Sequence, residues 1–264
     1  MDAVLNSLNF DINAKDRHGR VAVHWAAWKG DASVIIKLLN AGADPDLYDG
    51  GRRTPMHFAA LTRTSTCTKA LIDACADFNW PDDFHETPLR CACSTRRIEN
   101  IITLLHEGAD ADASTTAGIT PLMSALLAGE IEAVKILLAH GVDIEAKDDL
   151  GETAVTSAIW LNAHEIVEAL IIAGARLDVI NRSGRTVLHT AAQFGGVAMM
   201  EVLEKSRITM VDQTATNAEG LMALEVLRQR EDYTKQLNEA FGSLLISVQG
   251  SIYAAEFIRK SKSL

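Results

Sequence analysis

A short segment in the first third of the chain carries the side chains best suited to acid–base chemistry. Residues 80–86 read WPDDFHE, so a histidine stands between carboxylates. An imidazole titrates near neutral pH, and a neighbouring carboxylate can orient it as a general acid or base. The candidate set is His85, Asp83 and Glu86, with His18 as a further imidazole. The alternative is that the tryptophan packs between loops and the acidic side chains are simply solvated.

Four cysteines are present, and their spacing favours neither a disulfide framework nor a metal site. Cys91 and Cys93 are two residues apart on a predicted helix, so their side chains point to different faces. We expect all four to be buried, reduced thiols: Cys67, Cys75, Cys91 and Cys93. The sequence has no GxGxxG or GxxxxGKS/T phosphate loop and no GxSxG or HExxH motif. It therefore predicts no cofactor and no metal.

The composition is that of a packed but acidic protein. The 264 residues are 48% hydrophobic and 5% aromatic, and the net charge is −10. Residues 80–178 concentrate the acid, with 17 Asp and Glu against 6 Lys and Arg. This stretch is either a solvated acidic face or a docking surface for a basic partner. The charge disfavours nucleic acid. No run approaches the ~20 apolar residues of a membrane span and no signal peptide is visible, so we expect no membrane partner and a cytoplasmic or nuclear location.

A period of 33 residues organises most of the chain. One series, all threonine after its first member, marks predicted helix starts: Val21, Thr54, Thr87, Thr120, Thr153 and Thr186. A second series marks predicted helix ends: Gly42, Cys75, Gly108, Gly141 and Gly174. A short repeat of this kind cannot bury its apolar face alone, so neighbouring repeats must stack.

The elements of one unit are clearest in residues 113–145. Thr120 caps a first helix over about residues 121–127, with Pro121 at its first position. A second helix over about 131–139 has apolar residues at helical spacing and ends at Gly141, a C-cap residue. Residues 143–151 then form the extended hairpin that opens the next unit.

These motifs resemble the ankyrin-repeat family. The resemblance is carried by TPMH at 54–57, TPL at 87–89 and 120–122, TVLH at 186–189 and AGAD at 41–44, and it covers about residues 5–214. It implies an all-α ankyrin-repeat solenoid of about six helix-turn-helix repeats with β-hairpin loops, plus C-terminal capping helices. In the family, the motif histidine hydrogen-bonds between neighbouring hairpins. That role is implied here for His24, His57 and His189.

The resemblance also implies a domain organisation. Residues 1–13 are a partial N-terminal repeat or cap, and residues 14–214 hold six repeats: 14–46, 47–79, 80–112, 113–145, 146–178 and 179–214. Residues 215–264 are expected to form a degenerate repeat and a helical cap, with helices near 221–230, 232–246 and 251–260.

The family recognises partners through hairpin tips and the exposed face of the first helix of each repeat, which line a concave groove. Carried over to this sequence, these positions place Trp25, Trp28, Phe58 and Leu61 together, and we call these four residues the N-terminal aromatic patch. Exposed aromatic clusters on rigid surfaces are typical binding anchors. The alternative is that residues 1–10 or a preceding repeat cover the patch. The other candidate binding residues are Trp80, Phe84, Trp160, Phe194, Arg20 and Arg53.

The leading functional hypothesis is a non-catalytic scaffold that binds a protein partner in this groove. The alternative is an enzyme or binder acting on an apolar small molecule in an aromatic pocket, as an acid–base isomerase, cyclase or hydrolase. A third hypothesis is a recognition module of a larger protein, since the chain starts within a repeat. If residues 215–264 fold over the groove, they favour the small-molecule reading, and if they only cap the stack, they leave it open to a protein.

Overall fold

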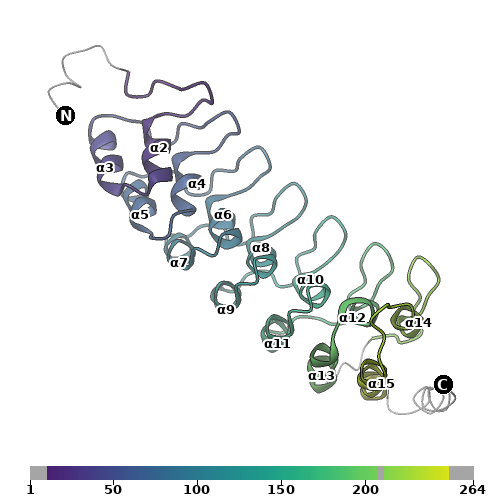
Figure 1. The fold of residues 1–264 in the computed structure, drawn as a ribbon. Coiled ribbons are helices and arrows are strands. Elements are labelled where there is room, and N and C mark those ends of the chain that lie inside the picture. The colour runs from purple at the N-terminus through teal and green to yellow at the C-terminus, as the bar shows by residue number, and fades with distance from the viewer. Residues whose placement is uncertain (1–10, 207–210, 250–264) are drawn as a thin grey trace. The chain divides into compact units, whose positions relative to one another are not determined.

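The computed structural model describes residues 11–206 and 211–249, and within these ranges it contains helices and no strand. The expected all-α repeat architecture is confirmed in this part of the chain. The helices follow one another in pairs (Figure 1): α2 (Ala22–Lys29) and α3 (Ala32–Asn40), α4 (Pro55–Ala60) and α5 (Thr66–Asp73), α6 (Pro88–Ser94) and α7 (Ile98–His106), α8 (Pro121–Leu127) and α9 (Ile131–His140), α10 (Ala154–Trp160) and α11 (His164–Ile172), α12 (Val187–Phe194) and α13 (Val197–Lys205), α14 (Ala223–Arg228) and α15 (Lys235–Gln249).

The chain divides into two compact units, residues 1–128 and 129–264. In the first unit, α2, α4, α6 and α8 pack side by side in one row, and α3, α5 and α7 form a second row. The second unit repeats this arrangement, with α10, α12 and α14 in one row and α9, α11, α13 and α15 in the other. Within each unit, the helices of a row thus bury their apolar sides against one another and against the other row.

Threonine and proline start the first helix of several pairs, as the sequence predicts. Thr120 has extended backbone, and its Oγ1 accepts a hydrogen bond from the Met123 N–H at 3.3 Å. Pro121 follows as the first helical residue, where a missing N–H costs nothing. Gly141 ends α9 with φ 89°. Cys75 holds the corresponding place after α5 with φ 60°, a strained conformation for a residue that has a side chain.

The apolar core lies between the two rows of helices. In the first unit its fully buried side chains include Ile35, Met56, Leu71, Leu89, Ile101, Leu104, Leu122 and Leu126. In the second unit they include Leu137, Ile159, Val167, Leu170, Met199, Leu203 and Phe241. Phe241 lies on α15, which packs against α13, so this helix extends the stack of the second unit.

Loops joining successive pairs are closed by a side chain at their base. In residues 49–53, the Asp49 N–H donates to the Arg53 carbonyl at 2.9 Å, and Asp49 Oδ1 accepts the N–H groups of Gly51 and Arg53. The same two side-chain acceptor bonds recur at Asp16, Asp82, Thr115, Asp148, Asn181 and Asn217. We call these turns the fingertips. The expected β-hairpins show very little strand pairing. In the described residues the only β-bridges are the isolated antiparallel pairs Ile180–Thr186 and Thr216–Met222.

The turn between α4 and α5 is held by a side chain from another helix pair. It has no glycine, as is also true of the α6–α7 and α10–α11 turns, and the buried Asn100 of α7 stabilises its backbone. Its Nδ2 donates to the Thr62 carbonyl at 2.8 Å and the Ala60 carbonyl at 3.2 Å, while its Oδ1 accepts from Thr68 Oγ1 at 2.7 Å. A side chain of the next helix pair therefore fixes this turn.

Two of the three helices expected after residue 215 are present in the described residues. The helix expected near 221–230 is α14, and the one expected near 232–246 is α15. The third helix, near 251–260, and most of the N-terminal cap lie outside the described residues, and the repeat boundaries themselves stay a prediction. None of the described helices has the length and apolar character needed to cross a membrane.

Candidate functional site

Helices α2 and α4 bring the N-terminal aromatic patch together. The Trp25 and Trp28 rings stack with centroids 5.7 Å apart at 3°, and the Trp28 and Phe58 rings stack at 6.0 Å and 22°. Trp25 is 42% exposed and Trp28 is 56% exposed, although both are large apolar side chains. Phe58 differs from the other three because it is only 6% exposed. It lies beneath Trp28 as the base of the patch, and Leu61 is exposed beside it.

Two arginines of the fingertips lie over these rings. The Arg20 guanidinium is 5.1 Å from the Trp25 ring centroid, 5.3 Å from that of Trp28 and 5.5 Å from that of Phe58. The Arg53 guanidinium is 5.1 Å from the Phe58 centroid. Cations at this distance are attracted to the negative ring faces. The predicted binding residues Arg20 and Arg53 are therefore part of the same surface as the aromatic patch.

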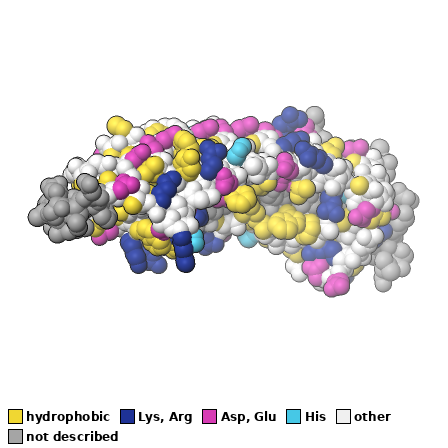
Figure 2. Space-filling model, turned by 90° about the horizontal axis from the view of Figure 1, so that it is seen from above, with side chains coloured by type: hydrophobic (Ala, Val, Ile, Leu, Met, Phe, Trp, Pro, Cys, Tyr) yellow, Lys and Arg dark blue, Asp and Glu magenta, His cyan; other side chains and the backbone are white. Residues whose placement is uncertain are grey.

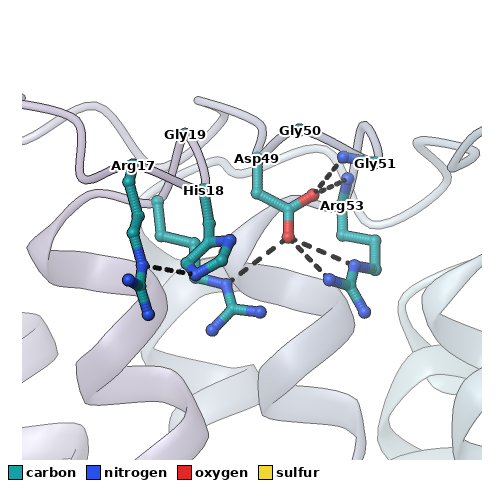
Figure 3. Close-up of a pocket in the computed structure, with 8 residues that line it drawn as sticks. Arg17, His18, Gly19, Asp49, Gly50, Gly51 and Arg53 are labelled. Carbon is teal, nitrogen blue, oxygen red and sulfur yellow. Dashed lines mark hydrogen bonds and ion pairs between the residues drawn. The ribbon is translucent and has the colours of Figure 1, made fainter.

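Asp49 orients both arginines and was not among the residues singled out from the sequence. Its Oδ2 accepts from Arg53 Nη2 at 2.8 Å and from Arg53 Nε at 3.2 Å, and it lies 3.7 Å from Arg20 Nε (Figure 3). Burial raises the pKa of the Asp49 carboxyl, but hydrogen bonds from Arg53 and from the Gly51 N–H outweigh it and leave the pKa lowered. Asp49 is thus ionised at neutral pH. The signal that could have found it is the series Asp16, Asp49 and Asp82, again 33 residues apart.

Three cavities surround the two arginines. The arginine pocket, of about 390 Å³, lies between the first two fingertips and is lined by Arg17, His18, Gly19, Arg20, Asp49, Gly50, Gly51 and Arg53 (Figure 3). The apolar pocket, of about 340 Å³, is lined by Arg20, Trp28, Arg53, Phe58, Leu61 and Thr62. A third cavity, of about 330 Å³, extends from Arg53 and Phe58 to Asp82, Phe84 and Glu86. Basic side chains beside hydrophobic ones are visible toward the N-terminal end in Figure 2.

The acid–base candidates are not brought together by hydrogen bonds. His85 and Asp83 are exposed, and the described structure shows no hydrogen bond or ion pair between His85 and Asp83 or Glu86. Glu86 instead forms an ion pair with Arg90, and His18 Nε2 accepts from Arg17 Nε at 3.0 Å. His85 has φ 59° and occupies the fingertip place that glycine holds in most other loops. Its position is therefore explained by the turn.

The aromatic residues of the third fingertip separate in the structure. Trp80 is half-buried and stacks on Tyr48 of the preceding loop at 5.9 Å, with the Arg52 guanidinium 5.4 Å from its ring centroid. Phe84 is exposed at the tip, where its side chain is accessible to a partner. Trp80 thus packs between loops, as the alternative interpretation held.

A second aromatic pair lies in the other unit. Trp160 at the end of α10 and Phe194 at the end of α12 have ring centroids 5.9 Å apart in an edge-to-face arrangement. Trp160 is 52% exposed, whereas Phe194 is half-buried. Neither ring has an arginine over it among the described cation–π contacts. This pair offers apolar area without the charges of the N-terminal aromatic patch.

The motif histidines connect neighbouring loops from buried positions. His57 Nδ1 accepts the Thr54 N–H at 3.1 Å, which leaves the proton on Nε2, and Nε2 donates to the Glu86 carbonyl at 3.0 Å. His24 and His189 make the corresponding bonds. Burial lowers the pKa of His57 to about 4 and also lowers the pKa of His24 and His189. These histidines are neutral structural groups.

The cysteines also follow the packing, with one exception. Cys67, Cys91 and Cys93 are buried, and burial raises the pKa of Cys91 to about 11 and that of Cys93 to about 12. These thiols stay protonated at neutral pH. Cys75 was expected to be buried, but it is exposed because it occupies the turn after α5. Across the described ranges, no group of three or more His, Cys, Asp or Glu is arranged to hold a metal ion.

Comparison with known proteins identifies the family. A model described as ankyrin repeats (3 copies) matches residues 23–115 and 98–181. The crystal structure of the human ASB11 ankyrin repeat domain is similar, with a TM-score of 0.73 and 25% sequence identity, covering 88% of this chain and 100% of that chain. No curated protein sequence matches. Since the ankyrin-repeat model matches more than half of the sequence, the chain belongs to the ankyrin-repeat family.

Proposed function

We propose that this chain binds a partner protein through the N-terminal aromatic patch and the first two fingertips. Ankyrin repeats are in general protein–protein interaction modules, and the proposal assigns that role to a particular surface. The observation that carries it is the exposure of Trp25 and Trp28, stacked at 5.7 Å on the rigid helix α2. Large aromatic side chains concentrate binding energy at interfaces, and exposed apolar clusters of this kind mark interaction sites.

The environment of the two tryptophans supports the proposal further. The apolar pocket lies directly beside Trp28 and can accept a side chain from a partner. Trp25 Nε1 donates to Asp16 Oδ2 at 3.2 Å, which holds its ring against the first fingertip. A side chain that is already ordered loses little entropy on binding.

The test is retention of proteins from the native cell extract on the immobilised chain, read by mass spectrometry. The double variant Trp25→Ser with Trp28→Ser is compared with Trp160→Ser, a matched control that removes an exposed tryptophan from the other unit. We expect wild type and control to retain the same specific protein and the double variant to lose it, with helical content by circular dichroism unchanged. Equal retention by all three would refute the proposal.

The same measurement addresses the small-molecule alternative. Small molecules released from the immobilised chain are analysed together with the proteins. A retained apolar molecule without a protein partner would favour the alternative and direct attention to the apolar pocket. The acid–base residues do not support catalysis in this alternative, because His85 lies exposed at a turn and makes no hydrogen bond to Asp83 or Glu86 in the described structure.

A further inference from the structure

The charges around the aromatic patch point to the chemistry of the partner, and this inference rests on the proposed function. The arginine pocket contains three guanidinium groups and one carboxylate, in a chain whose net charge is −10. The arginine pocket is therefore basic although the protein as a whole is acidic. It indicates recognition of negative charge at this place.

The one carboxylate of the pocket is already engaged. The Asp49 side chain is 2% exposed, and its two oxygens accept hydrogen bonds from Arg53 and from backbone N–H groups. It orients the guanidiniums from within the pocket and presents little negative charge to a ligand. Asp16 on the first fingertip is exposed, but its Oδ1 accepts the N–H groups of His18 and Arg20 and its Oδ2 accepts Trp25 Nε1.

The guanidiniums, by contrast, keep donors for a ligand. Arg17 is exposed, and its only hydrogen bond in the described structure is from Nε to His18. The Arg20 side chain makes no hydrogen bond there. Its Nε is buried 3.7 Å from Asp49 Oδ2, and the side chain is 17% exposed. Arg53 uses Nε and Nη2 on Asp49, and its side chain is 41% exposed. Planar guanidiniums match the geometry of carboxylates, which can accept two N–H bonds at once.

Arg20 and Arg53 line the arginine pocket on one side and the apolar pocket on the other. Two side chains of one ligand can therefore fill both pockets if they lie close together on its backbone. In an extended peptide, successive side chains point to opposite faces, and every second side chain shares a face at a spacing of about 7 Å, so residues i and i+2 meet this requirement.

We propose that the occupant is an acidic, extended segment of the partner protein, in which an aromatic or large aliphatic side chain enters the apolar pocket and an Asp or Glu two residues away binds Arg17, Arg20 and Arg53. The third fingertip sets the direction of the segment. Asp83 is exposed there and repels negative charge, whereas Phe84 offers an apolar contact. The acidic end of the segment therefore lies over the first two fingertips.

The test uses fluorescein-labelled peptide pools with a central Trp, Phe or Leu and flanks of Asp and Glu, of Lys and Arg, or of Ser and Gly. Fluorescence anisotropy reports binding to the full chain at low and high salt. We expect the acidic pool to bind most tightly and to weaken as salt is added, because exposed charges are screened. Preference for the basic or neutral pool would overturn the proposal.

Arg17→Glu tests the pocket itself, since the only hydrogen bond of this exposed side chain in the described residues is to its neighbour His18. The matched control is Arg63→Glu, which makes the same charge reversal at an exposed arginine outside the pocket. Arg17→Glu should weaken the acidic pool by about tenfold or more and leave the neutral pool unchanged, while Arg63→Glu changes neither. Equal effects of the two variants would refute the assignment to this pocket.

Two further measurements distinguish the ways in which this inference and the proposed function could fail. Inorganic phosphate is added as a competitor, and competition at the same concentration as the acidic pool would show a simple anion site and overturn the peptide proposal. If the tryptophan double variant loses the native partner while the acidic pool does not bind, the proposed function stands and this inference fails. If that variant keeps its partner, the proposed function itself has failed.

Discussion

Acidification should destabilise the first unit through His57, and the structure sets the magnitude. Burial lowers the pKa of His57 to about 4, against an ordinary value of 6.5. The unfolded chain therefore binds a proton in a pH range where the native chain does not. Because the native pKa is the lower one, stability is fully present above pH 6.5 and falls as the pH drops toward 4. The maximal loss is about 3 kcal/mol, and about 2 kcal/mol is lost between pH 7.5 and 5.

The perturbation is His57→Thr, because the chain already uses threonine in the same place. Thr156 Oγ1 accepts the Thr153 N–H at 2.8 Å, as His57 Nδ1 does for Thr54. The variant should keep that bond and lose the bond to the Glu86 carbonyl, at a cost of about 1 kcal/mol at pH 7.5. Its stability difference between pH 7.5 and 5 should be smaller than that of wild type by about 2 kcal/mol.

The assay is urea unfolding at pH 7.5 and pH 5, followed by circular dichroism and by NMR signals of residues in the first unit. The control His164→Thr removes an exposed imidazole and should keep the wild-type difference between the two pH values. His24 and His189 shift stability in the same direction, so some pH dependence will remain in the variant. An unchanged pH dependence in His57→Thr, or an imidazole that titrates near pH 6.5 in the folded chain, would refute the reasoning.

Three further predictions concern stability, each measured by urea unfolding at neutral pH. Gly141→Val should cost about 1 kcal/mol or more, because φ is 89° and this conformation is strained for a residue with a side chain, although a Cβ there would have no atom within 4 Å. Cys75→Gly, at φ 60°, should stabilise by up to about 1 kcal/mol, and a change of opposite sign in either variant would contradict this account. Asn100→Ala should cost about 2–3 kcal/mol, because the carbonyls of Thr62 and Ala60 lose a donor, and a loss below about 0.5 kcal/mol would show that water replaces it.

The helices were predictable because their signals are local. Thr120 and Pro121 define the start of α8 without reference to the rest of the chain, and the predicted range of 121–127 agrees with the structure. Gly141 likewise ends α9. A capping hydroxyl, a fixed proline φ and a glycine with positive φ act within a few residues. The 33-residue spacing then repeats these local signals along the chain.

The candidate site was less predictable because exposure depends on neighbours. Trp25 and Phe58 hold the same place in successive repeats, yet only Trp25 is exposed. Phe58 is covered by Trp28 and lies under Arg53, and periodicity does not contain that information. The role of individual acidic residues was also hard to predict, because it depends on hydrogen bonds within each loop. Asp82 and Asp148 were counted in the acidic stretch 80–178, whereas each closes a fingertip by accepting backbone N–H groups.

The order within the fingertips bears directly on how the proposed acidic partner would be recognised. Holding a long side chain in one conformation costs about 0.5–1.5 kcal/mol when it happens on binding. Arg53 is already held by two bonds to Asp49, and Arg20 already lies against three aromatic rings. An acidic segment would therefore meet guanidiniums that are oriented before it arrives. Specificity at such a surface depends on the fixed direction of the remaining guanidinium N–H donors. A change in net charge elsewhere on the chain would not reproduce that direction.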